Sequence, residues 1–293
     1  MKLGIFDVID PLPILKNPHA IAVLRPWTDA GNSVTLAVSW LESHLSAEQL
    51  GKISRPGNFF DFTKYRPVTR YNNGNREIII PNTIVTSAKQ EKGPDLVFIN
   101  MLEPNIFAEE YIDSVVKLLE TLEIQRYCLL GSMYDMVPHT RPLMVTGSAF
   151  GKDASEDLTK AGISSSAYEG PTTICSLISQ GAAKLGIETM SIMVRLPQYT
   201  QLEKDYTGQV RLLEVIRSLY GFPIDNAILR RAEQQIKDID IEVNRNRKMK
   251  EVVAHLEAYY DAQSITRQKK ETPKLSPDIE NFLKEMENRF RQD

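Results

Sequence analysis

The sequence contains few cysteines and no long apolar run, and each absence excludes a class of protein. The 293 residues include only Cys128 and Cys175, both within apolar segments. Two buried thiols fit a reducing compartment better than a disulfide framework does. No run of about 18 apolar residues is present, so no membrane span is predicted. Acidic residues interrupt the apolar N-terminus at Asp7 and Asp10, which argues against a secretory signal. These observations predict a cytoplasmic protein.

The sequence also has no excess of charge of either sign. The net charge is -3, whereas a dedicated nucleic-acid-binding protein usually has a basic balance or a basic face. No nucleic-acid partner is therefore predicted. Hydrophobic residues make up 42% and charged residues 25% of the chain, as in ordinary soluble globular proteins. The length is sufficient for one large domain, or for one domain with an appendage.

Glycine is absent after Gly221, and charge becomes dense beyond the same point. Residues 225–293 contain 14 Lys or Arg and 14 Asp or Glu, a balance typical of exposed helices with many ion pairs. We therefore predict a core domain over residues 1–221 and a charged helical extension over residues 222–293.

Within the extension, apolar residues recur every three or four positions. This spacing predicts one long helix over residues 225–263, with Leu229, Ala232, Ile236, Ile239 and Val243 on one face. Residues 264–273 are predicted to be a polar connector. Ser276 and Pro277 are typical of a helix start, so a last helix is expected to carry Ile279, Phe282, Leu283 and Met286 on one face.

The first 221 residues alternate short apolar runs with amphipathic segments. Strands are predicted at residues 20–24, 95–99, 127–131 and 190–196, and helices at 33–45, 106–122 and 174–185. Repeated strand–helix units favour a largely parallel sheet covered on both faces. Asn73-Gly74 between extended segments predicts an antiparallel hairpin, so the predicted fold is an α/β mixed sheet flanked by helices.

Several loops carry short motifs that follow one another in a fixed order. They are Trp27-x-Asp29-Ala30-Gly31, Phe60-Asp61-Phe62-Thr63 with Arg66-Pro67, Glu103-Pro104-Asn105, Pro138-His139-Thr140-Arg141-Pro142, Val145-Thr146-Gly147-Ser148 and Tyr168-Glu169-Gly170-Pro171. In this order, from about His19 to Tyr199, the chain resembles a bacterial branch of the proteasome assembly chaperone 2 family. The helical C-terminal region is similar to that branch too.

This resemblance implies a nucleoside phosphorylase-like core, a homo-oligomer with a trimer as the first expectation, and a role in protein assembly. Older descriptions of the family add an ATP-grasp or carboxylate-amine ligase label. Archaeal relatives that dock on proteasome rings carry a C-terminal hydrophobic-tyrosine-any residue motif, whereas this sequence ends in Arg291-Gln292-Asp293. We therefore expect no docking on proteasomes through such a tail.

Candidate binding residues lie in the loops that follow the predicted strands, where open α/β sheets bind ligands. They are Asp29, Gly31, Asn32, Glu103, His139, Arg141, Thr146 and Glu169. Histidine side chains in general titrate near neutral pH, and Arg141 can hold a carboxylate or phosphate by two bonds. Alternatively, both side chains bond backbone carbonyls of a loop stiffened by two prolines, and Asp29 and Glu169 cap helices.

The motifs leave two classes of function open. The first is a protein–protein assembly module. The second is an enzyme or small-molecule binder, phosphorylase-, hydrolase- or ligase-like, whose loops 138–142 and 168–171 face each other across one concave site. Residues 147–152 have the wrong spacing for a phosphate loop, and no His or Cys pair has zinc spacing. The sequence therefore names no catalytic residue and no cofactor, and no metal site is predicted.

Overall fold

The computed structural model describes residues 1–72, 74–166 and 168–266, which divide into two compact units. Unit 1 contains Met1–Asp29, Ala37–Gly131 and Thr146–Ile192. Unit 2 contains Ala30–Leu36, Ser132–Val145 and the chain from Met193 onward. Because the units alternate along the chain, they do not test the predicted domain boundary at residue 221, which stays a prediction.

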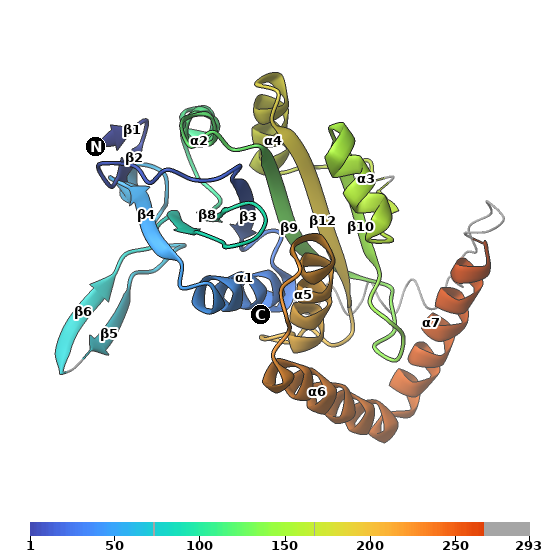
Figure 1. Cartoon of the computed structure of the whole chain (residues 1–293). Coiled ribbons are helices and arrows are strands. Elements are labelled where there is room, and N and C mark those ends of the chain that lie inside the picture. The colour runs from blue at the N-terminus through green and yellow to red at the C-terminus, as the bar shows by residue number, and fades with distance from the viewer. Residues whose placement is uncertain (73, 167, 267–293) are drawn as a thin grey trace. The chain divides into compact units, whose positions relative to one another are not determined.

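A large mixed sheet dominates the fold (Figure 1). Its strand order is β1 (Lys2–Leu3), β2 (Phe6–Val8), β4 (Glu48–Ile53), β7 (Ile84–Ala88), β8 (Leu96–Leu102), β3 (His19–Arg25), β9 (Arg126–Asp135), β12 (Glu188–Pro197), β10 (Val145–Phe150) and β11 (Ser164–Ser165). Strand β3 pairs in parallel with both β8 and β9, whereas β2, β4, β7 and β8 pair antiparallel in turn. The mixed sheet predicted from the sequence is confirmed, as are the four predicted strands.

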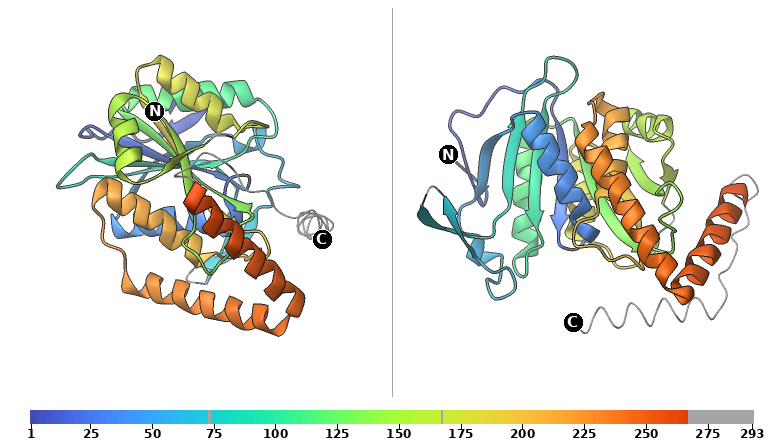
Figure 2. Two further views of the ribbon diagram at one scale, coloured as in Figure 1. Left: turned by 90° about the vertical axis from the view of Figure 1, so that its right-hand side faces the viewer. Right: turned by 90° about the horizontal axis from the view of Figure 1, so that it is seen from below.

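Helices cover both faces of the sheet in unit 1. On one face, α2 (Ala108–Thr121) and α4 (Ile174–Lys184) pack side by side, and α1 (Ser33–His44) covers the opposite face from Ala37 onward (Figures 1 and 2). A further helix, α3 (Lys152–Lys160), follows β10. The helices predicted at 33–45, 106–122 and 174–185 are therefore present.

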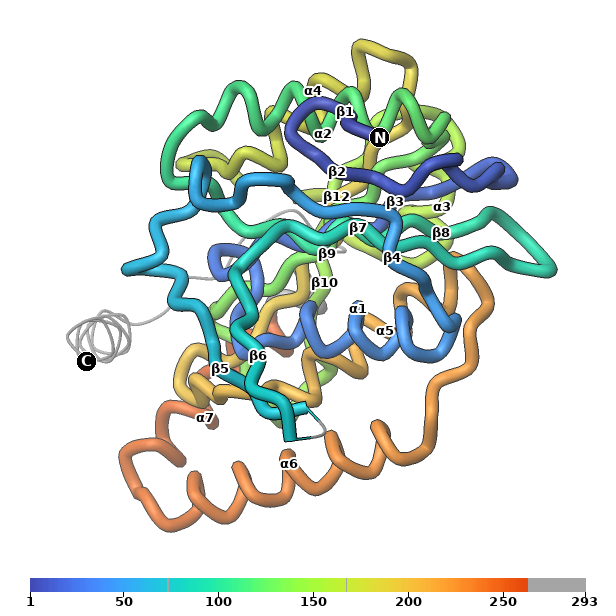
Figure 3. Tube along the Cα trace, turned by 90° about the vertical axis from the view of Figure 1, so that its left-hand side faces the viewer, coloured from blue at the N-terminus to red at the C-terminus, as the bar shows by residue number. Residues whose placement is uncertain are grey.

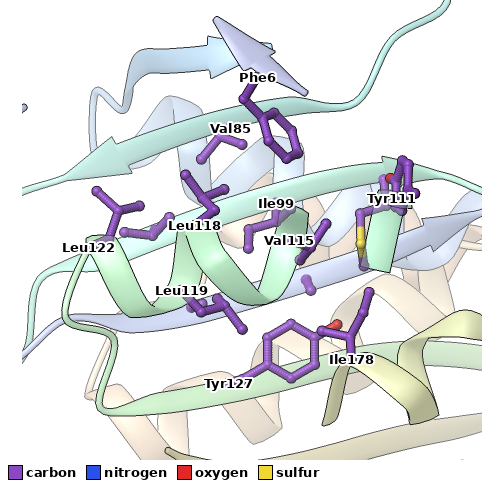
Figure 4. Packing of buried hydrophobic residues seen from close by; sticks show 14 of the residues in the cluster. Phe6, Val85, Ile99, Tyr111, Val115, Leu118, Leu119, Leu122, Tyr127 and Ile178 are labelled. Atoms are coloured by element: carbon purple, nitrogen blue, oxygen red, sulfur yellow. The ribbon is translucent and has the colours of Figure 1, made fainter. Parts of the chain in front are cut away.

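The core beneath α2 and α4 explains why these segments fold as they do. Five consecutive residues of β3 are fully buried, as expected for a strand covered on both sides. Helix α2 turns Val115, Leu118 and Leu119 toward the sheet, spaced at three and four residues, while Tyr127 of β9 lies beneath them (Figure 4). This spacing fixes which face of α2 is buried.

A two-stranded hairpin extends away from the sheet. It consists of β5 (Val68–Asn72) and β6 (Asn75–Ile79), which pair antiparallel with Asn72 opposite Asn75 (Figures 1 and 3). The sequence-based prediction of a hairpin here is confirmed by the pairing of β5 with β6. All ten strand residues are exposed.

The described residues of unit 2 after Met193 form three helices: α5 (Tyr206–Tyr220), α6 (Asn226–Arg245) and α7 (Arg247–Thr266). The prediction of one long helix over residues 225–263 is wrong, because the chain leaves helical geometry at Asn246. The Oδ1 atom of Asn246 accepts hydrogen bonds from the backbone N–H groups of Lys248 and Met249, at 3.1 and 3.2 Å. Asn246 is thus the N-cap of α7, a position that asparagine favours.

Helices α6 and α7 share a small apolar cluster in which Val243, Val252, Val253 and Leu256 pack with Tyr199. Helix α7 continues to Thr266, so residues 264–266 of the predicted connector are helical; the rest of that connector and the predicted last helix lie outside the described residues. Among the described residues no strand follows β12. Nor does any helix in the described part of the chain combine the length and apolarity needed to cross a membrane.

Candidate functional site

The structure distributes the candidate residues between the two units. Unit 1 holds Asp29, Glu103, Thr146 and Glu169, and unit 2 holds Gly31, Asn32, His139 and Arg141. Loops 138–142 and 168–171 thus belong to different units, and the concave site that they were predicted to share stays a prediction. Within each unit, the surroundings of the candidate residues can be followed in detail.

In unit 1, Glu103 lies at the carboxyl end of β8, beside the carboxyl end of β3. Its backbone N–H donates to the carbonyl oxygen of Arg25 at 3.1 Å, and its own carbonyl accepts the hydroxyl proton of Tyr65 at 3.0 Å. Burial raises the pKa of the Glu103 carboxyl. The pKa of Tyr65 is also raised, first by burial and then by the Glu103 charge, whereas the Arg25 charge opposes the shift. Arg25, Tyr65 and Glu103 therefore form one cluster.

Aromatic side chains surround this cluster. Phe60 contacts Tyr65 and Tyr111 edge-to-face, with ring centroids 5.8 and 6.3 Å apart. Tyr111 is fully buried, and its hydroxyl lies 2.7 Å from the Thr83 hydroxyl. Phe59 links Tyr111 to Phe107, with centroids 6.0 and 6.3 Å away. The ends of β3 and β8 thus carry polar groups in an apolar, aromatic surrounding.

Both cysteines are inert in their present environment. Cys128 and Cys175 are buried, and burial raises the pKa of each thiol to about 12. A thiolate is the nucleophilic form of cysteine, so neither residue is poised for nucleophilic chemistry at neutral pH. Two buried thiols are what the sequence analysis predicts.

The other candidate residues of unit 1 do not join this cluster by any described hydrogen bond. Thr146 is buried in β10, opposite Ser164 of β11, and Glu169 lies exposed in the loop before α4. The N-cap of α4 is Thr173, whose Oγ1 accepts from the Cys175 N–H at 3.2 Å, so the suggestion that Glu169 caps this helix is wrong. Asp29 is buried in the turn after β3.

In unit 2, Gly31 and Asn32 hold the loop that leads into α5. The Gly31 carbonyl accepts the N–H of Asp205 at 2.7 Å, and the Asn32 side chain donates to the Glu203 carbonyl at 2.8 Å. Gly31 has a φ of +58°, and a Cβ there would lie 2.7 Å from Cβ of Asp205. The close approach of the two loops explains why glycine occupies this position.

His139 of unit 2 is buried and fully hydrogen-bonded. The Tyr199 hydroxyl oxygen accepts the His139 backbone N–H at 2.8 Å and lies 2.5 Å from Nδ1. Nε2 is 3.0 Å from Oδ1 of Asp240 in α6 and donates to it, because an ionised carboxylate only accepts hydrogen bonds. Tyr199 and Asp240 thus fix the orientation of the ring.

Arg141 is held by two acids of α7. Its Nε and Nη2 donate to the two carboxylate oxygens of Asp261 at 2.9 and 2.8 Å, and Nη1 donates to Glu257 at 3.1 Å. The Thr140 hydroxyl donates to Glu257 at 2.5 Å, and the Tyr260 hydroxyl donates to the Pro142 carbonyl at 2.8 Å. The hydrogen bonds with Asp261 raise the pKa of Arg141 and lower that of Asp261. Loop 138–142 therefore anchors α6 and α7, and a ligand-binding role for Arg141 stays a prediction.

We expect Arg141→Gln to loosen α7 without unfolding the protein. The two-bond pair with Asp261 is the stronger kind of charge-assisted hydrogen bond, and its loss should raise the amide exchange rates of α7 several-fold. Hydrogen exchange followed by mass spectrometry measures this directly. Arg247→Gln is the matched control, since the Arg247 side chain is 94% exposed and its described ion pair, with Glu251, lies within α7. Equal exchange in the two variants would contradict an anchoring role for Arg141.

The sequence analysis did not identify the hydrogen-bond partners of His139 and Arg141. Tyr199, Asp240, Glu257 and Asp261 lie 60 to 120 positions away from loop 138–142, and nothing local distinguishes them. The three acids belong to charged helical faces whose ordinary interpretation is solvation. Arg25 was also missed, although its place before Pro26 at the end of a buried strand was a usable signal.

Among the described residues, no group of three or more His, Cys, Asp or Glu side chains is arranged to hold a metal ion.

A search of curated proteins found no match for the chain. Solved structures provide close likenesses of fold. A PAC2 family protein from Streptomyces avermitilis has a TM-score of 0.72 and 22% identity, covering 80% of this chain and 99% of that one.

Two proteins of Mycobacterium tuberculosis are similar as well. One, of unknown function, has a TM-score of 0.78 and 24% identity, covering 92% of each chain. The other is described as a proteasome-assembly chaperone homologue and has a TM-score of 0.69 and 22% identity, covering 80% of this chain and 99% of that one. At these identities the likeness shows the fold. The sequence model of the PAC2 family, however, matches residues 23–242, which is most of the chain, and the protein therefore belongs to the PAC2 family.

Proposed function

We propose that this chain is a protein–protein assembly module that acts as a homo-oligomer, with a chaperone-like role. The β5–β6 hairpin is the observation that carries the proposal. Val68, Tyr71, Ile78 and Ile79 of the hairpin are 52, 75, 63 and 43% exposed. Exposed apolar groups gathered on one projecting element mark an interaction surface more often than isolated ones do.

Both faces of the hairpin are partly apolar. Opposite residues of an antiparallel pair share a face, so Val68 and Ile79 lie on one face and Thr69 and Ile78 on the other. A hairpin that only covers its own domain has one apolar face. A lone two-stranded hairpin is also marginal in water. Two apolar faces and two unpaired edges fit a ribbon that is enclosed by another protein surface.

Family membership supports the same function. Solved relatives with this fold are described as proteasome-assembly chaperone homologues and, for a Pyrococcus furiosus protein, as an archaeal proteasome activator. Those descriptions apply to those proteins, and they make another protein the favoured class of partner here. The resemblance to the family favours self-association, and a trimer is the expected state.

Light scattering tests the proposal. At micromolar concentration the wild-type protein should show a mass close to three times the 33.2 kDa subunit mass. Tyr71→Asp with Ile78→Asp should shift the mass toward that of one subunit, because the charges oppose burial of the hairpin. The melting temperature of the dissociated subunit should change little, since both side chains are exposed.

Ile14→Asp is the matched control. Ile14 is 90% exposed and lies outside the hairpin, so this substitution adds one aspartate charge, half of what the hairpin variant adds, without altering the proposed interface. A wild-type mass of 33.2 kDa at micromolar concentration would contradict self-association. An oligomer that persists in the hairpin variant would instead remove the hairpin from the interface.

A further inference from the structure

The carboxyl ends of the neighbouring strands β3 and β8 lie where the connections that follow them run to opposite faces of the sheet. The two strands are parallel neighbours, and Arg25 at the end of β3 is paired with Leu102 at the end of β8. Helix α1 follows β3 and helix α2 follows β8, on opposite faces of the sheet (Figures 1 and 2). Open α/β sheets bind ligands in the crevice that such a divergence creates.

The Arg25 side chain stands at this point with one of its donors, Nε, unsatisfied among the described residues. Its Nε is buried, and it makes no hydrogen bond there. Arg126, Arg141 and Arg195 each form an ion pair, with Asp157 and Glu188, with Asp261 and with Asp135, although Nε of Arg195 likewise makes no hydrogen bond in the described part of the chain. A buried donor left without a partner costs free energy, so it favours a ligand that accepts its proton.

The surroundings of Arg25 restrict the ligand. Glu103 is half-buried beside it and, when ionised, repels a second negative charge, which disfavours a phosphate dianion. One guanidinium matches one carboxylate, and the free Nε is half of the two-bond arrangement that an arginine makes with a carboxylate. Exposed aromatic residues follow both strands along the chain: Trp27, two residues after Arg25, is 66% exposed, and Phe107, in the loop before α2, is 60% exposed. These rings offer contact area to an apolar group.

We infer that Arg25 anchors a binding site for an organic carboxylate with an apolar body, at the divergence of β3 and β8. Arg25 would pair with the carboxylate, and Trp27 and Phe107 would contact the apolar body. The inference goes beyond the proposed assembly function and does not depend on the hairpin. The same chemistry is offered by a small aryl or alkyl carboxylate and by the free C-terminus of a protein that ends in apolar residues.

Calorimetric titration with 4-phenylbutyrate tests the site in the full-length protein. Saturable binding is expected, and it should weaken about tenfold or more in Arg25→Gln, since a two-bond ion pair is lost. Arg25→Lys should bind with intermediate affinity, because it keeps the charge and loses the fork geometry. Arg230→Gln, at an exposed position of α6, is the control and should leave binding unchanged. Thermal melts confirm that each variant is folded.

Three further ligands make the test decisive. The neutral isostere 4-phenylbutanol should bind much more weakly than the carboxylate, and inorganic phosphate should not compete with it. Glu103→Gln should relax the exclusion of phosphate.

Acetyl-Leu-Phe with a free carboxylate, compared with its amide, distinguishes a small carboxylate from a protein C-terminus as the source of the ligand. Tighter binding of this peptide than of 4-phenylbutyrate would favour a protein C-terminus. Equal affinity for the carboxylate in wild type and Arg25→Gln, or preference for the alcohol or for phosphate, would overturn the inference. Light scattering of the same samples reports separately on assembly.

Discussion

Arg126→Met is expected to lower the free energy of unfolding by about 3 kcal/mol, because it removes the common partner of two partly buried acids. The Arg126 side chain is 6% exposed. Its Nη1 lies 2.7 Å from Asp157, and Nη2 and Nε lie 2.9 and 3.2 Å from one oxygen of Glu188. Removing the arginine leaves two carboxylates with much of their hydration already lost. Urea denaturation at pH 7 measures the change.

The loss of stability caused by Arg126→Met is also expected to depend on pH. Burial by itself would raise the pKa of Glu188, but the hydrogen bonds from Arg126 and its charge lower it overall. An acid whose pKa is lowered by folding stabilises the folded state above its unfolded pKa and loses this contribution as the pH falls. The difference between wild type and Arg126→Met should therefore shrink as the pH falls through the range in which Glu188 is protonated.

His19 supplies an independent readout of the same substitution. It is paired with Arg126 across β3 and β9. Burial, and then the Arg126 charge, lower the pKa of His19 to about 4. Arg126→Met should raise this pKa, which NMR titration of the histidine ring can follow. Lys160→Ala is the control, since Lys160 is 70% exposed and lies 3.9 Å from the same Asp157. A loss below about 1 kcal/mol for Arg126→Met, as for a surface pair, would contradict this account.

Leu118→Ala is expected to cost about 3 kcal/mol of unfolding free energy. Leu118 is fully buried in α2, between the helix and the sheet (Figure 4). The substitution removes apolar contacts and leaves a cavity, because β3 pairs with both β8 and β9 and this sheet resists collapse into it. Urea denaturation measures the loss.

Lys117→Ala is the control for Leu118→Ala. The neighbouring Lys117 is exposed, and alanine suits a helix at least as well as lysine does. We therefore expect a change within about 0.5 kcal/mol for Lys117→Ala. Similar values for the two variants would mean that α2 does not bury the face identified here.

Particular segments show how far the sequence alone could lead. The buried strands were predictable because an uninterrupted apolar run such as Ala20–Leu24 has only one stable environment, between two covered faces. Strands β4 and β7 were not predicted. They pair antiparallel with each other, and β4 includes exposed Glu48 and Lys52, so apolar runs do not mark them. Their pairing partners, rather than their own composition, make them strands.

The candidate site also separates what the sequence determines from what the tertiary structure decides. The sequence by itself determined the α/β class, the helical C-terminal region and the loops in which functional residues would gather, because periodicity and turn residues act locally. Only the tertiary structure decided which side chains meet. It paired His139 with Asp240 and Arg141 with Asp261, and it left Nε of Arg25 without a partner. Charge pairing joins residues that are distant along the chain, so burial and geometry decide it after the chain has folded.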